Sequence, residues 1–160
     1  MKKSILLLSL FVLFLSCSSD DKSDNLKNHP IVGSWILAEF EFDIDIEDYD
    51  VENQVFNDLS EKRRLALDSN LSVDFFENGE FETQSNREEL GGGKYTVKDN
   101  KLTLSDKETS EKFYYSIYFN RMTIEEDQTE LYQKKAVGTN QNLSKLIHRV
   151  ILKQIFIRVY

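Results

Sequence analysis

The chain has 160 residues and a formal net charge of −8 at pH 7, from 28 acidic residues against 20 lysines and arginines. This balance argues against nucleic acid as a partner, because nucleic acid is bound through clustered cations that displace counterions from phosphate. One cysteine excludes any disulfide within the chain, and the length is enough for one domain with its own core. All acidic residues lie at or before Glu130, so residues 131–160 carry only basic charges.

The first residues have the layout of an export signal. Lys2 and Lys3 precede an apolar run over residues 5–15, and small residues surround Cys17. At about 1.5 Å per residue the run covers roughly 17 Å, which is too short for a bilayer core of ~30 Å. The pattern resembles the signal of bacterial lipoproteins, which implies removal of residues 1–16 and lipid on Cys17. The alternative is an ordinary secretory signal followed by a free cysteine.

Residues 17–30 are predicted to be the lipidated N-terminus and a solvated tether, because they contain a single Leu and no other side chain that could pack. Ser18 resembles the residue that sorts lipoproteins to the outer membrane of Gram-negative bacteria. The pair Asp20 and Asp21 resembles a short surface-export signal, or is merely a soluble spacer. We therefore expect an exported protein held at the cell envelope, most simply at the outer membrane, with its periplasmic or surface side left open.

Alternating apolar and polar residues, and the turns between them, predict eight strands. Trp35 and Leu37 have the opposite parity from Phe40, which predicts a bulge near Ala38 or Glu39. Hairpin spacing between most of the strands indicates an antiparallel up-and-down meander. The predicted strands are residues 33–46, 71–76, 80–85, 93–98, 101–105, 112–119, 122–126 and 130–135.

Turn chemistry predicts how neighbouring strands pair. A three-residue loop with Gly79 in the left-handed region and two-residue turns at Asp99-Asn100 and Asn120-Arg121 connect successive strands. Gly91-Gly92-Gly93 is expected to form a flexible hairpin or loop ahead of the fourth strand. The predicted cross-strand pairs are Phe75 with Phe81, Val97 with Leu102, Tyr95 with Leu104, and Leu131 with Ile124.

Two amphipathic helices are predicted beside the strands. The first covers residues 51–68, where Val55, Phe56 and Leu59 have helical spacing, and it lies over one end of the sheet. The second lies in the basic tail, residues 136–160, and either packs on the outside of the barrel or rests on an anionic membrane surface. Its apolar stripe consists of Leu143, Leu146, Ile147, Val150, Ile151 and Ile155, beside Lys145, Arg149 and Lys153.

Three short motifs lie in the first, fourth and fifth predicted strands. They are Gly33-Ser34-Trp35, Gly93-Lys94-Tyr95-Thr96-Val97 and Leu102-Thr103-Leu104. Over roughly residues 31–135 the chain resembles the lipocalin-like domain common among small bacterial lipoproteins. The resemblance implies an all-β fold, an eight-stranded antiparallel up-and-down barrel, with Gly33 and Trp35 closing its base. True lipocalins place an arginine over this tryptophan, whereas the eighth predicted strand offers Lys134 and Lys135. Ligand transport of the true-lipocalin kind is therefore not implied.

The large rings of the predicted strands share the dry face of the sheet. An eight-stranded barrel is just wide enough to be filled by its own side chains or to hold one small ligand. Two functions follow: binding of a small hydrophobic molecule, or a filled barrel that serves as a structural or protein-interaction module. The candidate cavity-lining residues are Phe40, Phe42, Phe75, Phe81, Tyr95, Tyr115 and Phe119.

Catalysis and metal binding find little support among the residues. The two histidines, His29 and His148, lie in the tether and in the basic tail, so no Ser-His or Cys-His pair can be built within the barrel. Along the acidic stretch from Asp43, a calcium loop would need Gly where Asp48 stands and Glu where Gln54 stands. We therefore expect no enzymatic activity, no metal and no cofactor, and the residues identify no protein partner.

Overall fold

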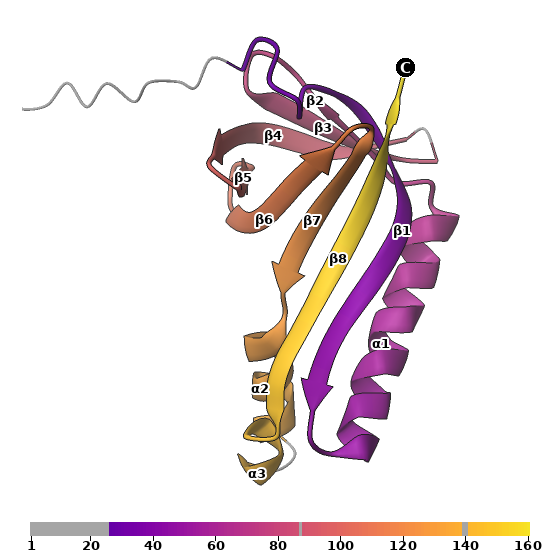
Figure 1. Cartoon of the computed structure of the whole chain (residues 1–160), viewed down its shortest axis with the longest axis vertical. Helices are drawn as coiled ribbons and strands as arrows, with labels where there is room; N and C mark the ends of the chain where they lie inside the picture. Colours follow the sequence, from indigo (N-terminus) through magenta and orange to yellow (C-terminus); the bar gives the residue numbers. More distant parts are fainter. Residues whose placement is uncertain (1–25, 87, 139–140) are drawn as a thin grey trace, which may run out of the picture.

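The computed structural model describes residues 26–86, 88–138 and 141–160, so Cys17, the predicted signal at 1–16 and the tether as far as residue 25 lie outside the described residues. Eight antiparallel strands close into a barrel in the order of the sequence (Figure 1). The elements are β1 (Gly33–Ile46), α1 (Tyr49–Asp68), β2 (Ser72–Phe75), β3 (Glu80–Ser85), β4 (Glu88–Lys98), β5 (Lys101–Ser105), β6 (Ser110–Tyr118), β7 (Arg121–Asp127), α2 (Thr129–Val137), α3 (Gln141–Ser144) and β8 (Ile147–Val159). The predicted all-β barrel, with a helix after its first strand, is confirmed.

Strands β1 to β5 follow the predicted pairing. Gly79 is left-handed, with φ of 81°, in the loop between β2 and β3, and β1 shifts its register against β8 between Leu37 and Glu39. The pairs Phe75 with Phe81, Tyr95 with Leu104, and Val97 with Leu102 are present. These features are local, because alternation sets the face of each residue and the turn sets the register.

The turn between β6 and β7 lies one residue earlier than predicted. Phe119 and Asn120 form it, and Ile117 therefore pairs with Met122. Phe119 is 81% exposed, so its predicted place on the dry face of the barrel is wrong. Moving a turn by one residue shifts the pairing of the two strands by two residues. The remaining side chains keep their faces of the sheet, so the alternation of apolar and polar residues could not locate the end of the strand.

The last part of the chain differs most from prediction. Residues 130–135, predicted as the eighth strand, lie in α2. A helix near the C-terminus is present, as α2 and the short α3, but the larger part of the tail 136–160, from Ile147 to Val159, is the strand β8 and not the predicted amphipathic helix. Ile124 consequently pairs with Gln154 and not with Leu131. The barrel therefore extends to Val159 and does not end at residue 135. Unequal spacing of the buried residues in this long strand imitated a helix, whereas its β-branched residues favour a strand: Ile147, Val150, Ile151, Ile155, Ile157 and Val159.

Strands β1 and β8 pair along almost their whole lengths and extend beyond the other strands as a two-stranded ribbon (Figure 1). Helix α1 lies along β1, and α2 and α3 lie at the far end of β8. Asp48 caps α1 by accepting hydrogen bonds from the N–H groups of Asp50 and Val51. A second core forms between these helices and the ribbon, separate from the core inside the barrel; its buried members are Ile46, Val55, Leu59, Tyr132, Ile147 and Val150.

The glycine run lies inside β4, which begins at Glu88, and not in the loop predicted ahead of that strand. Gly92 lies opposite Glu82 of β3, and Gly93 lies opposite Phe81. The backbone of β4 passes very close to both neighbouring strands at this point. Glycine is needed at these positions because a side chain would collide with the backbone of the neighbouring strands, and not because the segment is a flexible loop.

Candidate functional site

The barrel interior contains most of the predicted cavity residues, and these pack on one another. Phe75 meets Tyr95 edge-on, with 4.9 Å between ring centroids, and lies 6.3 Å from Phe81. The Tyr95 hydroxyl donates to the carbonyl oxygen of Phe76 over 2.8 Å. Burial raises the pKa of Tyr95 to about 12, so this hydroxyl stays protonated. These rings form part of the barrel core.

The other candidates are divided between the core and the surface. Phe40 and Tyr115 are buried in the barrel core, and Phe42 is half-buried between the two cores. Phe42 also meets Phe56 of α1 edge-on, at 6.0 Å. Phe119 lies outside, on the β6–β7 turn. The structure thus brings the predicted residues together as packed side chains, with Phe119 excluded.

The base of the barrel is built around Trp35, which is fully buried. Its indole N–H donates to the carbonyl oxygen of Ile31 over 2.7 Å, and the guanidinium carbon of Arg158 lies 4.6 Å from the ring centroid. Arg158 also donates to the carbonyl oxygen of Pro30. The cation over Trp35 is therefore Arg158 of β8, and not Lys134 or Lys135. Sequence reasoning missed Arg158 because it placed the eighth strand at residues 130–135, ahead of β8.

The segment leading into β1 also belongs to the base. Leu26 packs against the barrel core, and Ile31 is fully buried. A turn joins them, in which the backbone N–H of His29 donates to the carbonyl of Leu26. The tether predicted for residues 17–30 is thus wrong for residues 26–30, which fold onto the barrel because Leu26 finds an apolar surface there.

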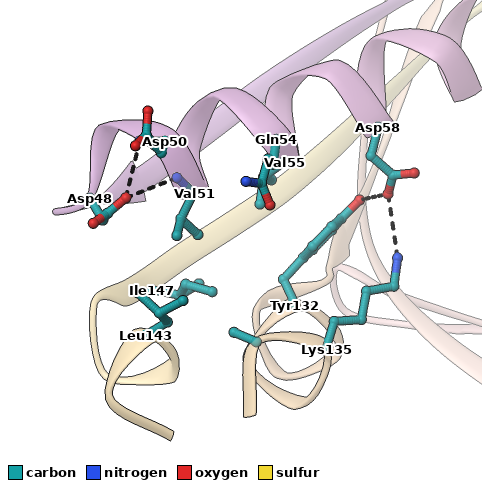
Figure 2. Close-up of a pocket in the computed structure, with 11 residues that line it drawn as sticks. Asp48, Asp50, Val51, Gln54, Val55, Asp58, Tyr132, Lys135, Leu143 and Ile147 are labelled. Atoms are coloured by element: carbon teal, nitrogen blue, oxygen red, sulfur yellow. Dashed lines mark hydrogen bonds and ion pairs between the residues drawn. The ribbon is translucent and has the colours of Figure 1, made fainter. Parts of the chain in front are cut away.

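A groove of about 460 Å³ lies outside the barrel, between α1 and the pair α2–α3 (Figure 2). Both walls of the groove carry apolar side chains together with charged and polar ones, a mixture suited to small amphiphilic molecules. Sequence reasoning missed the groove, because α2 was predicted as a strand. The apolar residues are Val51, Val55, Ala136, Leu143 and Ile147, and the polar ones are Asp48, Asp50, Gln54, Asp58, Tyr132 and Lys135.

A polar cluster at one end of the groove joins α1 to α2. The Tyr132 hydroxyl donates to the carboxylate of Asp58, which also pairs with Lys62 at 3.2 Å and Lys135 at 3.4 Å. Both ammonium groups lie over the Tyr132 ring, 5.6 and 4.7 Å from its centroid. The hydrogen bond from Tyr132, helped by the lysines, lowers the pKa of Asp58, while burial and Asp58 raise the pKa of Tyr132. Neither group is thus poised to exchange a proton near neutral pH.

Tyr132→Phe is expected to raise the pKa of the Asp58 carboxyl toward its ordinary value of 3.8, because the lost hydrogen bond is the largest cause of its lowering. The contribution of Asp58 to stability is present above that ordinary value and is lost as pH falls through the lowered pKa. An NMR titration of the carboxyl carbon in both proteins measures the shift. An unchanged midpoint in Tyr132→Phe would show that the lysines alone set this pKa.

The acidic face of β1 is paired with the basic residues of β8. Arg149 lies 3.0 Å from Asp43, and His148 lies 2.8 Å from Glu47. Opposite charges such as those of Arg149 and Asp43 stabilise the pairing of two strands modestly, and this pair joins β8 to β1. Among the described residues, no group of three His, Cys, Asp or Glu side chains is placed to hold a metal ion.

Comparison of the chain with protein-family models, with curated proteins and with solved structures gives no match. In the described part of the chain, no helix has the length and apolar character needed to cross a membrane.

Proposed function

We propose that this protein is a lipid-anchored lipoprotein of the bacterial cell envelope, most simply of the outer membrane, with a lipocalin-like barrel that binds and does not catalyse. The proposed anchor is the lipid on Cys17, because the residues before it resemble a lipoprotein signal. The observation that carries the proposal is the base of the barrel, where Arg158 covers the buried Trp35. True lipocalins place an arginine over this tryptophan, so Arg158 supports the resemblance at a point where the sequence analysis, with Lys134 and Lys135 in the predicted eighth strand, found a departure.

Metabolic labelling with a fatty acid tests the anchor. We expect label on the wild-type chain and on Ser19→Ala, and no label on Cys17→Ala, because the thiol is the acceptor for lipid. Ser19→Ala is the matched control, since it changes a small residue close to the cysteine and leaves the thiol in place. Label on Cys17→Ala would contradict the assignment of the anchor.

The groove between α1 and α2–α3 is the proposed site for a small hydrophobic molecule. The predicted cavity residues other than Phe119 pack in the barrel core, so the barrel serves as the scaffold, whereas the groove combines apolar side chains with acidic ones. A molecule with an apolar body and a polar or cationic end fits this lining. The packed rings also favour the second function, a filled barrel that acts as a protein-interaction module.

Native mass spectrometry of the detergent-purified full chain separates the two functions. We expect a co-purified small molecule on the wild type, its loss in Leu143→Gln, which changes the groove, and its retention in Leu131→Gln. Leu131 is 45% exposed on α2 and does not line the groove, so it is a matched control. Retention in Leu143→Gln would contradict the groove site, and a wild type without any small molecule would favour the interaction module.

A further inference from the structure

Two exposed rings project from one end of the barrel. Tyr118 and Phe119, at the β6–β7 turn, are 75% and 81% exposed, and their rings meet edge-on at 4.5 Å. We call this pair the aromatic tip. Exposed rings placed against each other form a compact apolar surface, and such a surface indicates a contact with something outside the molecule.

The aromatic tip lies at the end of the barrel where the N-terminal segment enters. Arg158 connects the two: its backbone N–H donates to the carbonyl oxygen of Asn120 over 2.8 Å, and its guanidinium donates to Pro30. Helices α2 and α3 lie at the opposite end of the molecule (Figure 1). A lipid attached upstream of Leu26 would therefore be attached to the end that carries the tip.

The turn at the tip departs from the usual chemistry of hairpin turns. Phe119 has φ of 55°, a left-handed conformation that costs a bulky residue about 1–2 kcal/mol and that glycine, asparagine and aspartate adopt most easily. The β4–β5 turn provides the comparison within this chain, because Asp99 there has φ of 56°. Residues held in an unfavourable backbone conformation cluster at functional sites, so an exposed Phe119 in this conformation is a candidate for function.

The chain between Cys17 and Leu26 is short. Nine peptide steps can span at most roughly 30 Å. The base of the barrel therefore stays within reach of the bilayer that holds the lipid. Tyrosine is enriched at the level of the lipid headgroups, where apolar and polar surroundings meet, and phenylalanine is among the apolar residues that interfacial segments bury at the boundary with the acyl chains.

We propose that the aromatic tip inserts into the membrane interface beside the lipid on Cys17, as a second contact that orients the barrel with its base toward the bilayer and α2 and α3 away from it. This inference rests on the proposed lipid anchor. The sequence-based proposal of a membrane-binding cationic helix is replaced by it, because that segment is β8 and its Arg149 pairs with Asp43.

Quenching by brominated lipids tests the contact. The full-length lipidated protein is placed in vesicles of phosphatidylethanolamine and phosphatidylglycerol with brominated acyl chains, as Phe119→Trp and as Tyr49→Trp. Tyr49 is a matched control, because it is 74% exposed and begins α1 at the other end of β1. We expect the brominated chains to lower the tryptophan emission of Phe119→Trp about twofold more than that of the parent protein, which contains only Trp35. The emission of Tyr49→Trp should fall no more than that of the parent.

Flotation of the same samples separates failure of the anchor from failure of the tip. If the parent does not float with the vesicles, the anchor is wrong and this contact falls with it. If it floats but positions 119 and 49 are quenched equally, the anchor stands and the tip proposal is overturned. A blue shift of Phe119→Trp that depends on protein concentration in detergent would assign the tip to a second copy of the chain, and would also overturn it.

Discussion

Trp35→Ala is expected to lower the free energy of unfolding by about 3–5 kcal/mol, the usual cost of removing a fully buried large aromatic side chain. The substitution leaves a cavity at the base of the barrel and leaves the carbonyl of Ile31 without its indole donor. It also takes the ring away from beneath the Arg158 guanidinium. Urea unfolding measures the loss, and for a domain of this size Tm should fall by about 10–15 °C.

Two other variants show whether the effect comes from the burial of Trp35. Trp35→Phe keeps most of the ring and loses the N–H, so it should lose about 1–2 kcal/mol. Tyr49→Ala removes an exposed ring and should stay within about 0.5 kcal/mol of the wild type. If Trp35→Ala lost less than about 1 kcal/mol, the base would not be the closure described here.

Gly93→Ala is expected to destabilise the barrel by about 3 kcal/mol, at the upper end of the usual cost of overpacking. A Cβ on Gly93 would stand 2.1 Å from the carbonyl oxygen of Ser105, and one on Gly92 would stand 2.3 Å from that of Phe81. Both obstacles are backbone atoms of neighbouring strands. Relief therefore requires β4 to move away from β5 or β3, which weakens the ladders between them.

Gly138→Ala is the matched control for this effect. Gly138 ends α2 with φ of −61°, and its added Cβ would meet its nearest neighbour at 3.4 Å. The control should unfold at the same urea concentration as the wild type, or at a slightly higher one because alanine loses less backbone entropy on folding. A Gly93→Ala protein as stable as the wild type would mean that β4 does not approach β5 as closely as described.

The strand pairs that could be predicted from the sequence are those joined by short turns. Parity and turn residues are enough to pair Phe75 with Phe81 and Tyr95 with Leu104, because each pair is joined by a short turn. Closure of the barrel is not local, since Ser34 pairs with Val159. Neighbours along the chain carry no signal for such a pair. The eighth strand was therefore assigned to residues 130–135, which a turn at Asp127-Gln128 would place beside the seventh strand, and these residues lie in α2.

In the candidate site, too, features set by neighbouring residues could be predicted, whereas contacts between distant segments could not. Burial of Phe40, Phe75 and Tyr95 follows from alternation, but alternation cannot distinguish a ring that lines a cavity from a ring that fills it. The groove depends on contacts between segments far apart in sequence, such as Asp58 with Tyr132. No periodicity or motif marks such a meeting. The exposure of Phe119 was missed for the simpler reason that the strand ends one residue earlier than its pattern.

The mass of the mature N-terminus tests the central claim most directly. The full chain is purified from a Gram-negative host in detergent, and its N-terminal peptide is analysed by mass spectrometry. We expect residues 1–16 to be absent and Cys17 to be the first residue, with acyl chains on its sulfur and amine. A first residue other than Cys17, or an unmodified cysteine, would contradict the account of this protein as a lipid-anchored barrel.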